Sequence, residues 1–259
     1  MTIGTDEQSS SELSDQESSN STPVRISCVT GRGVYSDYWK HLNCYELSHQ
    51  ELSSRVSRLR QWKAESPSNA EWVARIDPEV IPEMFSDERG ISSISEAAIA
   101  RALSRVEALD APLLLLHTPS SIRPSAEHER AVITLRERLP SHLPLVWRAD
   151  GLWGDSEHYF DLCASQHITP VIDPLMWDED LSLPSGSLGY WKVMGGAGLS
   201  PRLSEYDLDK LLDLADQWLS LAELNASAEA TQGGHTGLWV NFTSSKMYSA
   251  ARRWRSSLM

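Results

Sequence analysis

Residues 144–153 read PLVWRADGLW, a short apolar run, Pro144 to Trp147, that ends at Arg148 and Asp150. A run of this length, without alternation and bounded by charge and glycine, is typical of a strand buried on both faces of a parallel sheet. Seven other stretches have a similar form, and they are Arg25–Val29, Cys44–Leu47, Trp72–Ile76, Pro112–His117, Thr169–Asp173, Gly189–Met194 and Gly237–Phe242. Together with residues 144–148 they predict eight strands.

Amphipathic stretches with helical spacing separate these strands. They cover Gln50–Ala64, Ser95–Leu109, Glu127–Leu139, Ser156–His167, Tyr206–Leu224 and Ser245–Leu258. The connectors Tyr35–Asn43 and Asp178–Leu188 are too short for long helices. Eight strands alternating with helices predict a single α/β domain, a TIM (β/α)8 barrel over residues 23–259, with short or irregular helices after strands 1 and 6. A doubly wound sheet is the alternative, but Thr30–Gly33 lacks the third glycine of a dinucleotide fingerprint.

Composition limits the compartment and the partners. The formal net charge of −13 argues against a surface-wide attraction to nucleic acid or to acidic membranes. Residues 1–22 are acidic and serine-rich with almost nothing apolar, so we expect a disordered tail. Three cysteines without a CxxC motif indicate reduced thiols and a cytoplasmic protein. No apolar run reaches membrane-spanning length, so no membrane partner is expected.

Charged and polar residues gather where the predicted strands end. They are Arg32, Glu46, Arg75, His117, Arg148, Asp150, Asp173, Lys192 and Asn241, with Lys246 just beyond the last strand. In a barrel these ends converge on one mouth, where ligands bind. Two interpretations stay open. The cations pair with the acids in an internal network, because buried ions need partners, or they hold an anion, because arginine suits carboxylate and phosphate.

The segment 195–198 reads GGAG and follows the seventh strand. Many barrels hold phosphate in the loops after strands 7 and 8, although glycine runs are also common in plain turns. The candidate ligand-binding residues are therefore Arg32, Arg75, His117, Arg148, Lys192, Gly195, Gly196 and Lys246. Glu46 and Asp173 are the candidate catalytic residues, provided that their environments separate their pKa values.

A metal site is the competing hypothesis. Glu46, His117, Asp150 and Asp173 could supply nitrogen and oxygen ligands, as in metal-dependent barrel hydrolases. The histidines form no close pair of the H-x-H or H-x3-H kind, so no metal and no other cofactor is expected.

Several strand-end motifs follow one family pattern. Residues 28–35 and Trp39 loosely keep an opening G-T-S-G-W-x-Y-x-x-W, Tyr45-Glu46 keeps V-E, residues 111–119 keep L-G-P-L-L-F-Q-L-P, and Asp173-Pro174 keeps V-D-x-P. In these motifs, taken in order, the chain after residue 24 resembles the YecE-like family, also called domain of unknown function 72 (DUF72). The resemblance implies a TIM barrel and no established reaction.

The chain departs from that pattern at its active face. Val146 replaces the glutamate of an E-x-R motif, Met194 replaces a histidine, and Thr243-Ser244 replaces two asparagines. Arg148 thus reads as a retained cation that has lost its acidic partner. The first hypothesis is a barrel, enzyme or former enzyme, for an anionic phosphate-bearing small molecule or nucleic-acid fragment. The alternatives are a non-catalytic scaffold and, by fold analogy, a metal-dependent hydrolase or nuclease.

Overall fold

The computed structural model describes residues 24–30, 37–77, 81, 96–154, 156–177, 186–196, 200–229 and 236–258, with side chains in the long helix to residue 224. The predicted tail at residues 1–22 lies outside the described residues. Arg32 and the connector residues 178–185 also lie outside them.

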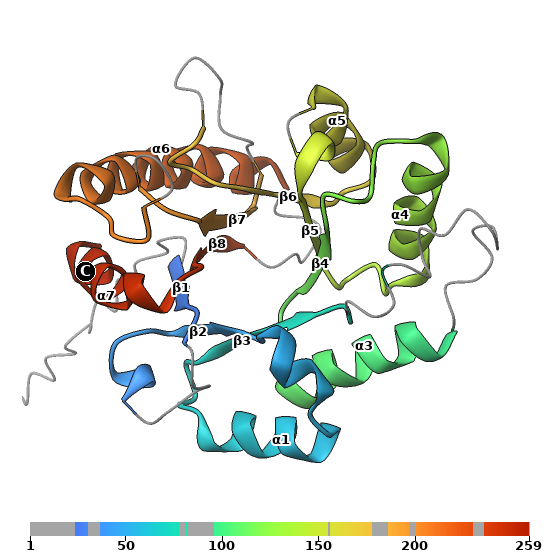
Figure 1. Cartoon of the computed structure of the whole chain (residues 1–259), viewed down its shortest axis with the longest axis horizontal. Helices are drawn as coiled ribbons and strands as arrows, with labels where there is room; N and C mark the ends of the chain where they lie inside the picture. The colour runs from blue at the N-terminus through green and yellow to red at the C-terminus, as the bar shows by residue number, and fades with distance from the viewer. Residues whose placement is uncertain are drawn as a thin grey trace, which may run out of the picture.

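All eight predicted strands are confirmed. They are β1 (Val24–Cys28), β2 (Cys44–Glu46), β3 (Glu71–Arg75), β4 (Leu114–Thr118), β5 (Leu145–Ala149), β6 (Thr169–Ile172), β7 (Leu188–Val193) and β8 (Gly237–Phe242). They form one parallel sheet in the order β1-β8-β7-β6-β5-β4-β3-β2. Figure 1 shows the helices arranged around this sheet, which confirms the predicted TIM barrel.

Side chains join β1 to β2, the two strands at the ends of the hydrogen-bonded order. The Asn43 side chain accepts from the Ile26 amide at 2.8 Å and donates to the Val24 carbonyl at 3.0 Å. The Tyr38 hydroxyl donates to the Cys44 carbonyl at 2.7 Å and accepts from the amide of the last β1 residue at 3.1 Å. Tyr38 opens η1 (Tyr38–Lys40), so the short helix predicted after the first strand helps to close the barrel.

The outer layer contains the predicted helices with shifted ends. They are α1 (Val56–Glu65), α3 (Glu96–Leu109), α4 (Ala126–Arg138), α5 (Glu157–Ser165), α6 (Glu205–Glu229) and α7 (Tyr248–Ser257), with short turns η2 (His49–Ser53), η4 (Gly151–Trp153) and η6 (Ser245–Met247). The helix predicted over residues 50–64 is divided, because Ser54 and Arg55 are extended. In the described part of the chain, no helix is both long and apolar enough to cross a bilayer.

Strand periodicity divides the barrel interior into an apolar and a polar layer. Cys44, Val73, Leu115, Val146, Tyr190 and Trp239 pack together inside the barrel. The residue two positions further along each strand points to the same side, since side chains alternate between faces. Those positions hold Glu46, Arg75, His117, Arg148, Lys192 and Asn241. The fold thus assembles the polar strand ends into one layer at the C-terminal mouth.

Candidate functional site

Glu46 is the centre of the buried part of this layer. Its carboxylate accepts hydrogen bonds from the Tyr190 hydroxyl at 2.6 Å and from Lys192 Nζ at 2.7 Å, and Arg75 Nη1 lies 3.4 Å away. Burial alone would raise the pKa of Glu46, but the charges of Lys192 and Arg75 outweigh it and lower the pKa to about 2. Burial lowers the pKa of Lys192 to about 8, although Glu46 opposes this shift. These groups therefore form an internal ion cluster.

A second set of contacts continues from Arg75 toward the mouth. Arg75 Nη2 lies 3.3 Å from His117 Nδ1, and His117 Nε2 lies 2.7 Å from Asp150 Oδ2. Arg148 Nε donates to the other oxygen of Asp150 at 2.9 Å. A neutral His117 fits between Arg75 and Asp150 when Nε2 carries the proton and Nδ1 accepts. Burial would raise the pKa of Asp150, but its bond to His117 and the charge of Arg148 lower it to about 2.

The outer edge of Arg148, its Nη2 atom, has a weak hydrogen-bond acceptor. Its Nη2 atom lies 3.3 Å from Met194 Sδ, and a thioether is a poor acceptor. Asp173, on the neighbouring strand end, accepts from the Met194 amide and the Leu175 amide, each at 3.1 Å. Burial raises the pKa of Asp173 to about 6 in spite of these hydrogen bonds and the nearby charge of Arg148. The mouth therefore offers an arginine edge beside a carboxyl group that titrates near neutrality.

The glycine-rich loop has a packing role at Gly196. The Gly196 amide donates to the Ser200 carbonyl at 2.9 Å, and a Cβ atom at this position would lie 2.6 Å from Asp207 Oδ2. Asp207 in turn accepts from the amide and hydroxyl of Ser204 at the start of α6, both at 2.7 Å. Glycine is needed at position 196 because the loop passes close to Asp207. The Gly196 amide is already hydrogen-bonded to Ser200, so it is not available to a ligand.

Lys246 lies in η6, directly after β8. It lines an open depression of about 460 Å³ together with Ser200, Pro201 and Arg202. None of the described residues that line this depression is acidic. Sequence reasoning missed Arg202, although this arginine is visible in the sequence in the segment that follows the seventh strand.

The structure thus assembles most of the predicted residues at one end of the barrel. Glu46, Arg75, His117, Arg148 and Lys192 belong to the connected layer, Asp173 lies at its edge, and Gly195, Gly196 and Lys246 belong to the loops after β7 and β8. The interpretation that Arg148 lacks an acidic partner is wrong, because Asp150 reaches back to it from the following loop. Sequence reasoning also missed Tyr190 as a partner of Glu46.

The residues of the alternative metal hypothesis do not form a ligand set. Glu46 is bound by two cations and a hydroxyl group, whereas Asp150 is bound by His117 and Arg148. Within the described ranges, no three side chains of histidine, cysteine, aspartate or glutamate come together as metal ligands.

Comparison with known proteins gives a structural answer only. The sequence matches no family model and no curated protein. A DUF72 family protein from Enterococcus faecalis superposes with a TM-score of 0.66 at 12% identity, over 92% of this chain and 97% of that one. A DUF72 family protein from Thermotoga maritima gives 0.64 at 14% identity, over 91% and 98%. The fold is that of the DUF72 proteins.

The DUF72 comparison confirms, at the level of the fold, the resemblance drawn from the strand-end motifs. SacUVDE is a more distant match, with a TM-score of 0.51 at 11% identity over 84% of this chain and 81% of that one. All these identities are low, so the comparison establishes a barrel fold shared with the DUF72 proteins and does not extend to the chemistry of the mouth.

Proposed function

We propose that the protein is a divergent DUF72-type barrel that binds an anionic, phosphate-bearing ligand at its C-terminal mouth. The observation that carries this proposal is the outer edge of Arg148. Its Nε atom is bound to Asp150, whereas Nη2 contacts only the sulfur of Met194 at 3.3 Å among the described residues. A ligand oxygen that displaces Met194 gains a charge-assisted hydrogen bond and leaves the pair with Asp150 intact.

Additional positive charge is available in the two loops that follow β7 and β8. Arg202 and Lys246 line the same depression, and neither has an ion pair among the described residues. TIM barrels frequently hold phosphate in this position. We therefore assign the phosphate of the ligand to these loops and a second anionic group to Arg148. Arg32 remains a sequence-based proposal for the same mouth.

The buried layer has an indirect role in this proposal. Arg75 and Lys192 hold Glu46 ionised beneath the mouth, and the partly exposed His117 binds Asp150 in the loop that follows Arg148. These residues therefore position Arg148 and set the local potential. Gly195 and Gly196 shape the loop beside Met194.

Catalysis at the mouth is the second candidate function. The pKa values favour Asp173 over Glu46 as the group that transfers a proton. A pKa of about 2 keeps Glu46 ionised at neutral pH, whereas a pKa of about 6 lets Asp173 accept and release a proton there. Asp173 also lies beside Arg148 at the mouth, where a ligand would be bound.

The cysteines support a cytoplasmic setting, since all three are free and buried.

Isothermal titration calorimetry on the full chain tests the binding proposal. The probes are 2-phosphoglycolate, a small ester with a phosphate and a carboxylate group, and a 5′-phosphorylated dinucleotide, a nucleic-acid fragment with two phosphate groups. Arg148→Lys keeps the charge and the reach to Asp150 but removes the planar fork, so we expect at least tenfold weaker binding. Arg60→Lys on α1, an exposed position, is the matched control. Equal affinities for wild type and R148K, or no binding of either probe, would refute the proposal.

A further inference from the structure

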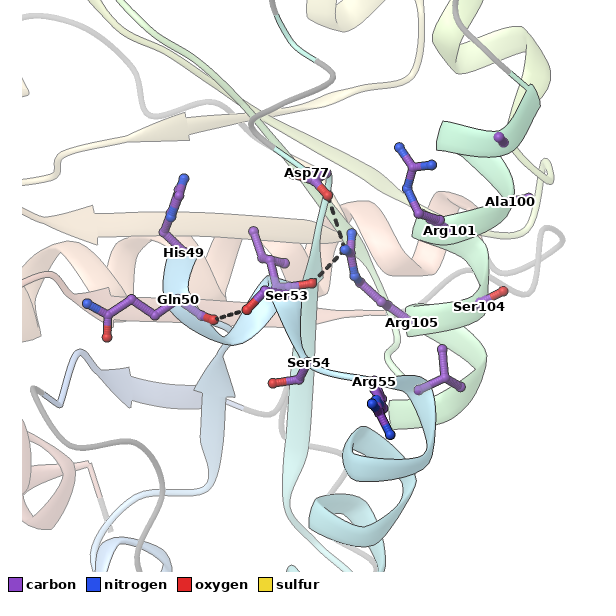
Figure 2. Close-up of a pocket in the computed structure, with 13 residues that line it drawn as sticks. His49, Gln50, Ser53, Ser54, Arg55, Asp77, Ala100, Arg101, Ser104 and Arg105 are labelled. Carbon is purple, nitrogen blue, oxygen red and sulfur yellow. Dashed lines mark hydrogen bonds and ion pairs between the residues drawn. The ribbon is translucent and has the colours of Figure 1, made fainter.

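The helix layer outside the barrel contains a second basic surface. A groove of about 680 Å³ lies between η2, the beginning of α1 and the first half of α3. Figure 2 shows its basic side chains, among them His49, Arg55, Arg101 and Arg105, gathered around the groove with Asp77. We call this surface the α1–α3 groove. It shares no residue with the mouth site.

Arg105 is the most buried cation of the groove, with a side chain that is 8% exposed. Its Nη2 atom donates to the Leu52 carbonyl at 2.6 Å and to Asp77 Oδ2 at 3.2 Å. Its Nη1 atom is buried and has no hydrogen-bond partner among the described residues. The guanidinium is therefore held at the floor of the groove through Nη2, where it adds positive charge.

The N-terminus of α1 opens into the same groove through Val56. Arg55 occupies the N-cap position, and its side chain makes no capping hydrogen bond. The first amides of an α-helix have no partner inside the helix, and the helix dipole makes this end attractive to anions. In α1, which has ten residues, the amides of Arg58 and Leu59 bond to the Arg55 carbonyl. The uncapped amides are therefore those of Val56, which lines the groove, and Ser57.

Two exposed arginines add charge around these donors. Arg101 and Arg105 project from one face of α3, four residues apart, and Arg55 lies opposite them at the beginning of α1 (Figure 2). Neither Arg55 nor Arg101 has an ion pair among the residues that the structure describes. Asp77 is the one acidic side chain among the described residues that line the groove, whereas three arginines line it, so the lining carries an excess of positive charge.

We propose that the α1–α3 groove is a phosphate-binding site. The uncapped amides of α1 receive one phosphate oxygen, and Arg55 and Arg101 clamp the others from the two sides. Arg105 adds positive charge from the floor of the groove. Donors that converge from a helix end and several guanidinium groups suit a tetrahedral, multiply charged anion better than a planar carboxylate with two oxygens.

The experiment titrates inorganic phosphate into the full chain by isothermal titration calorimetry. The background is R148K/K246Q, which weakens the mouth site, so that failure of one proposal does not imply failure of the other. In this background we expect Arg55→Gln and Arg101→Gln each to weaken phosphate binding at least tenfold. Both side chains are exposed, so neither variant is expected to disturb the fold.

Arg60→Gln is the matched control, because it removes the same charge from an exposed position of α1 that does not line the groove. Its affinity should equal that of the background. Three results would overturn the proposal: no phosphate binding in the background, R60Q weakening the binding as much as R101Q does, or acetate binding as tightly as phosphate.

Discussion

Replacing Glu46 with glutamine removes one charge from the centre of the barrel and changes the shape of the side chain very little. The Glu46 side chain is 4% exposed and that of Lys192 is 5% exposed. In the variant, Lys192 and Arg75 lose their common counter-ion. The amide group also places a donor where one oxygen accepted from Tyr190 or Lys192. We expect a large loss of stability with no change of fold.

Two estimates of the loss agree. Removing one partner of a buried ion pair costs about 3–5 kcal/mol, because the remaining charge stays out of water. The pKa of Glu46 gives the second estimate. It falls from the ordinary value of 4.5 to about 2 in the folded protein, which corresponds to about 3 kcal/mol at pH 7, since each pKa unit is worth about 1.4 kcal/mol. The free energy of unfolding should therefore fall by about 3–5 kcal/mol at pH 7.

Urea unfolding followed by tryptophan fluorescence, at several pH values, measures this loss. In wild type the stabilisation from Glu46 is complete above its ordinary pKa of 4.5 and is lost as the pH falls toward 2. In E46Q the pKa of folded Lys192 falls below about 8, so the unfolded chain binds more protons up to pH 10.5. The stability of E46Q should thus rise with pH from this lowered pKa up to 10.5, whereas that of wild type rises only from about 8, so the two stabilities should draw closer below pH 8.

Glu137→Gln, at an exposed position of α4, is the control and should change stability by less than about 0.5 kcal/mol. A loss below about 1 kcal/mol in E46Q, with the same pH dependence as wild type, would refute a buried ion cluster, because removing one partner of such a pair costs several times more.

Three further predictions concern closure, loop packing and the mouth. Asn43→Ala removes the side chain that bonds to both Ile26 and Val24 in β1, so urea unfolding should show a loss of about 2–3 kcal/mol; an unchanged midpoint would contradict this role. Gly196→Ala places Cβ 2.6 Å from an oxygen of Asp207 and should cost about 1–3 kcal/mol in the same assay. Sulfate, whose charge is constant between pH 7 and 5, should bind the mouth more tightly at pH 5 by calorimetry, because Asp173, with a pKa of about 6, becomes neutral there. Asp173→Asn should remove most of this pH dependence, and a flat wild-type profile would contradict it.

The barrel was predictable because its strands are covered on both faces. Such strands read as compact apolar runs, and the structure confirms all eight, most of them within one residue at each end. The largest strand shift is at β4, which begins at Leu114 rather than at Pro112, where proline has no amide to donate. The division of the helix predicted over residues 50–64 was not visible, because neither Ser54 nor Arg55 is a helix breaker by type.

The positions of the mouth residues were predictable from the sequence, but the pairs that these residues form were not. Strand periodicity places Glu46 and Lys192 at the same level of the barrel, but they are 146 residues apart and their contact depends on the register of the strands between them. Only the structure shows that the internal network leaves one edge of Arg148 without a strong acceptor, so the proposed anion site is compatible with that network. Glu46, Lys192 and Arg75 bind one another in this network, whereas the Nη2 atom of Arg148 can still donate a hydrogen bond to a ligand.

Arg148 shows how the departures from the DUF72 pattern fit together. Val146 occupies the position two residues before the arginine and belongs to the apolar interior, so the strand itself supplies no carboxylate at that position. Asp150, two residues after it, binds Nε instead and is held in turn by His117. The acidic partner of Arg148 therefore comes from the residue after the strand and not from the strand itself. Because this acid engages Nε, and Met194 offers only a thioether sulfur to Nη2, Nη2 has no strong acceptor among the described residues of the mouth.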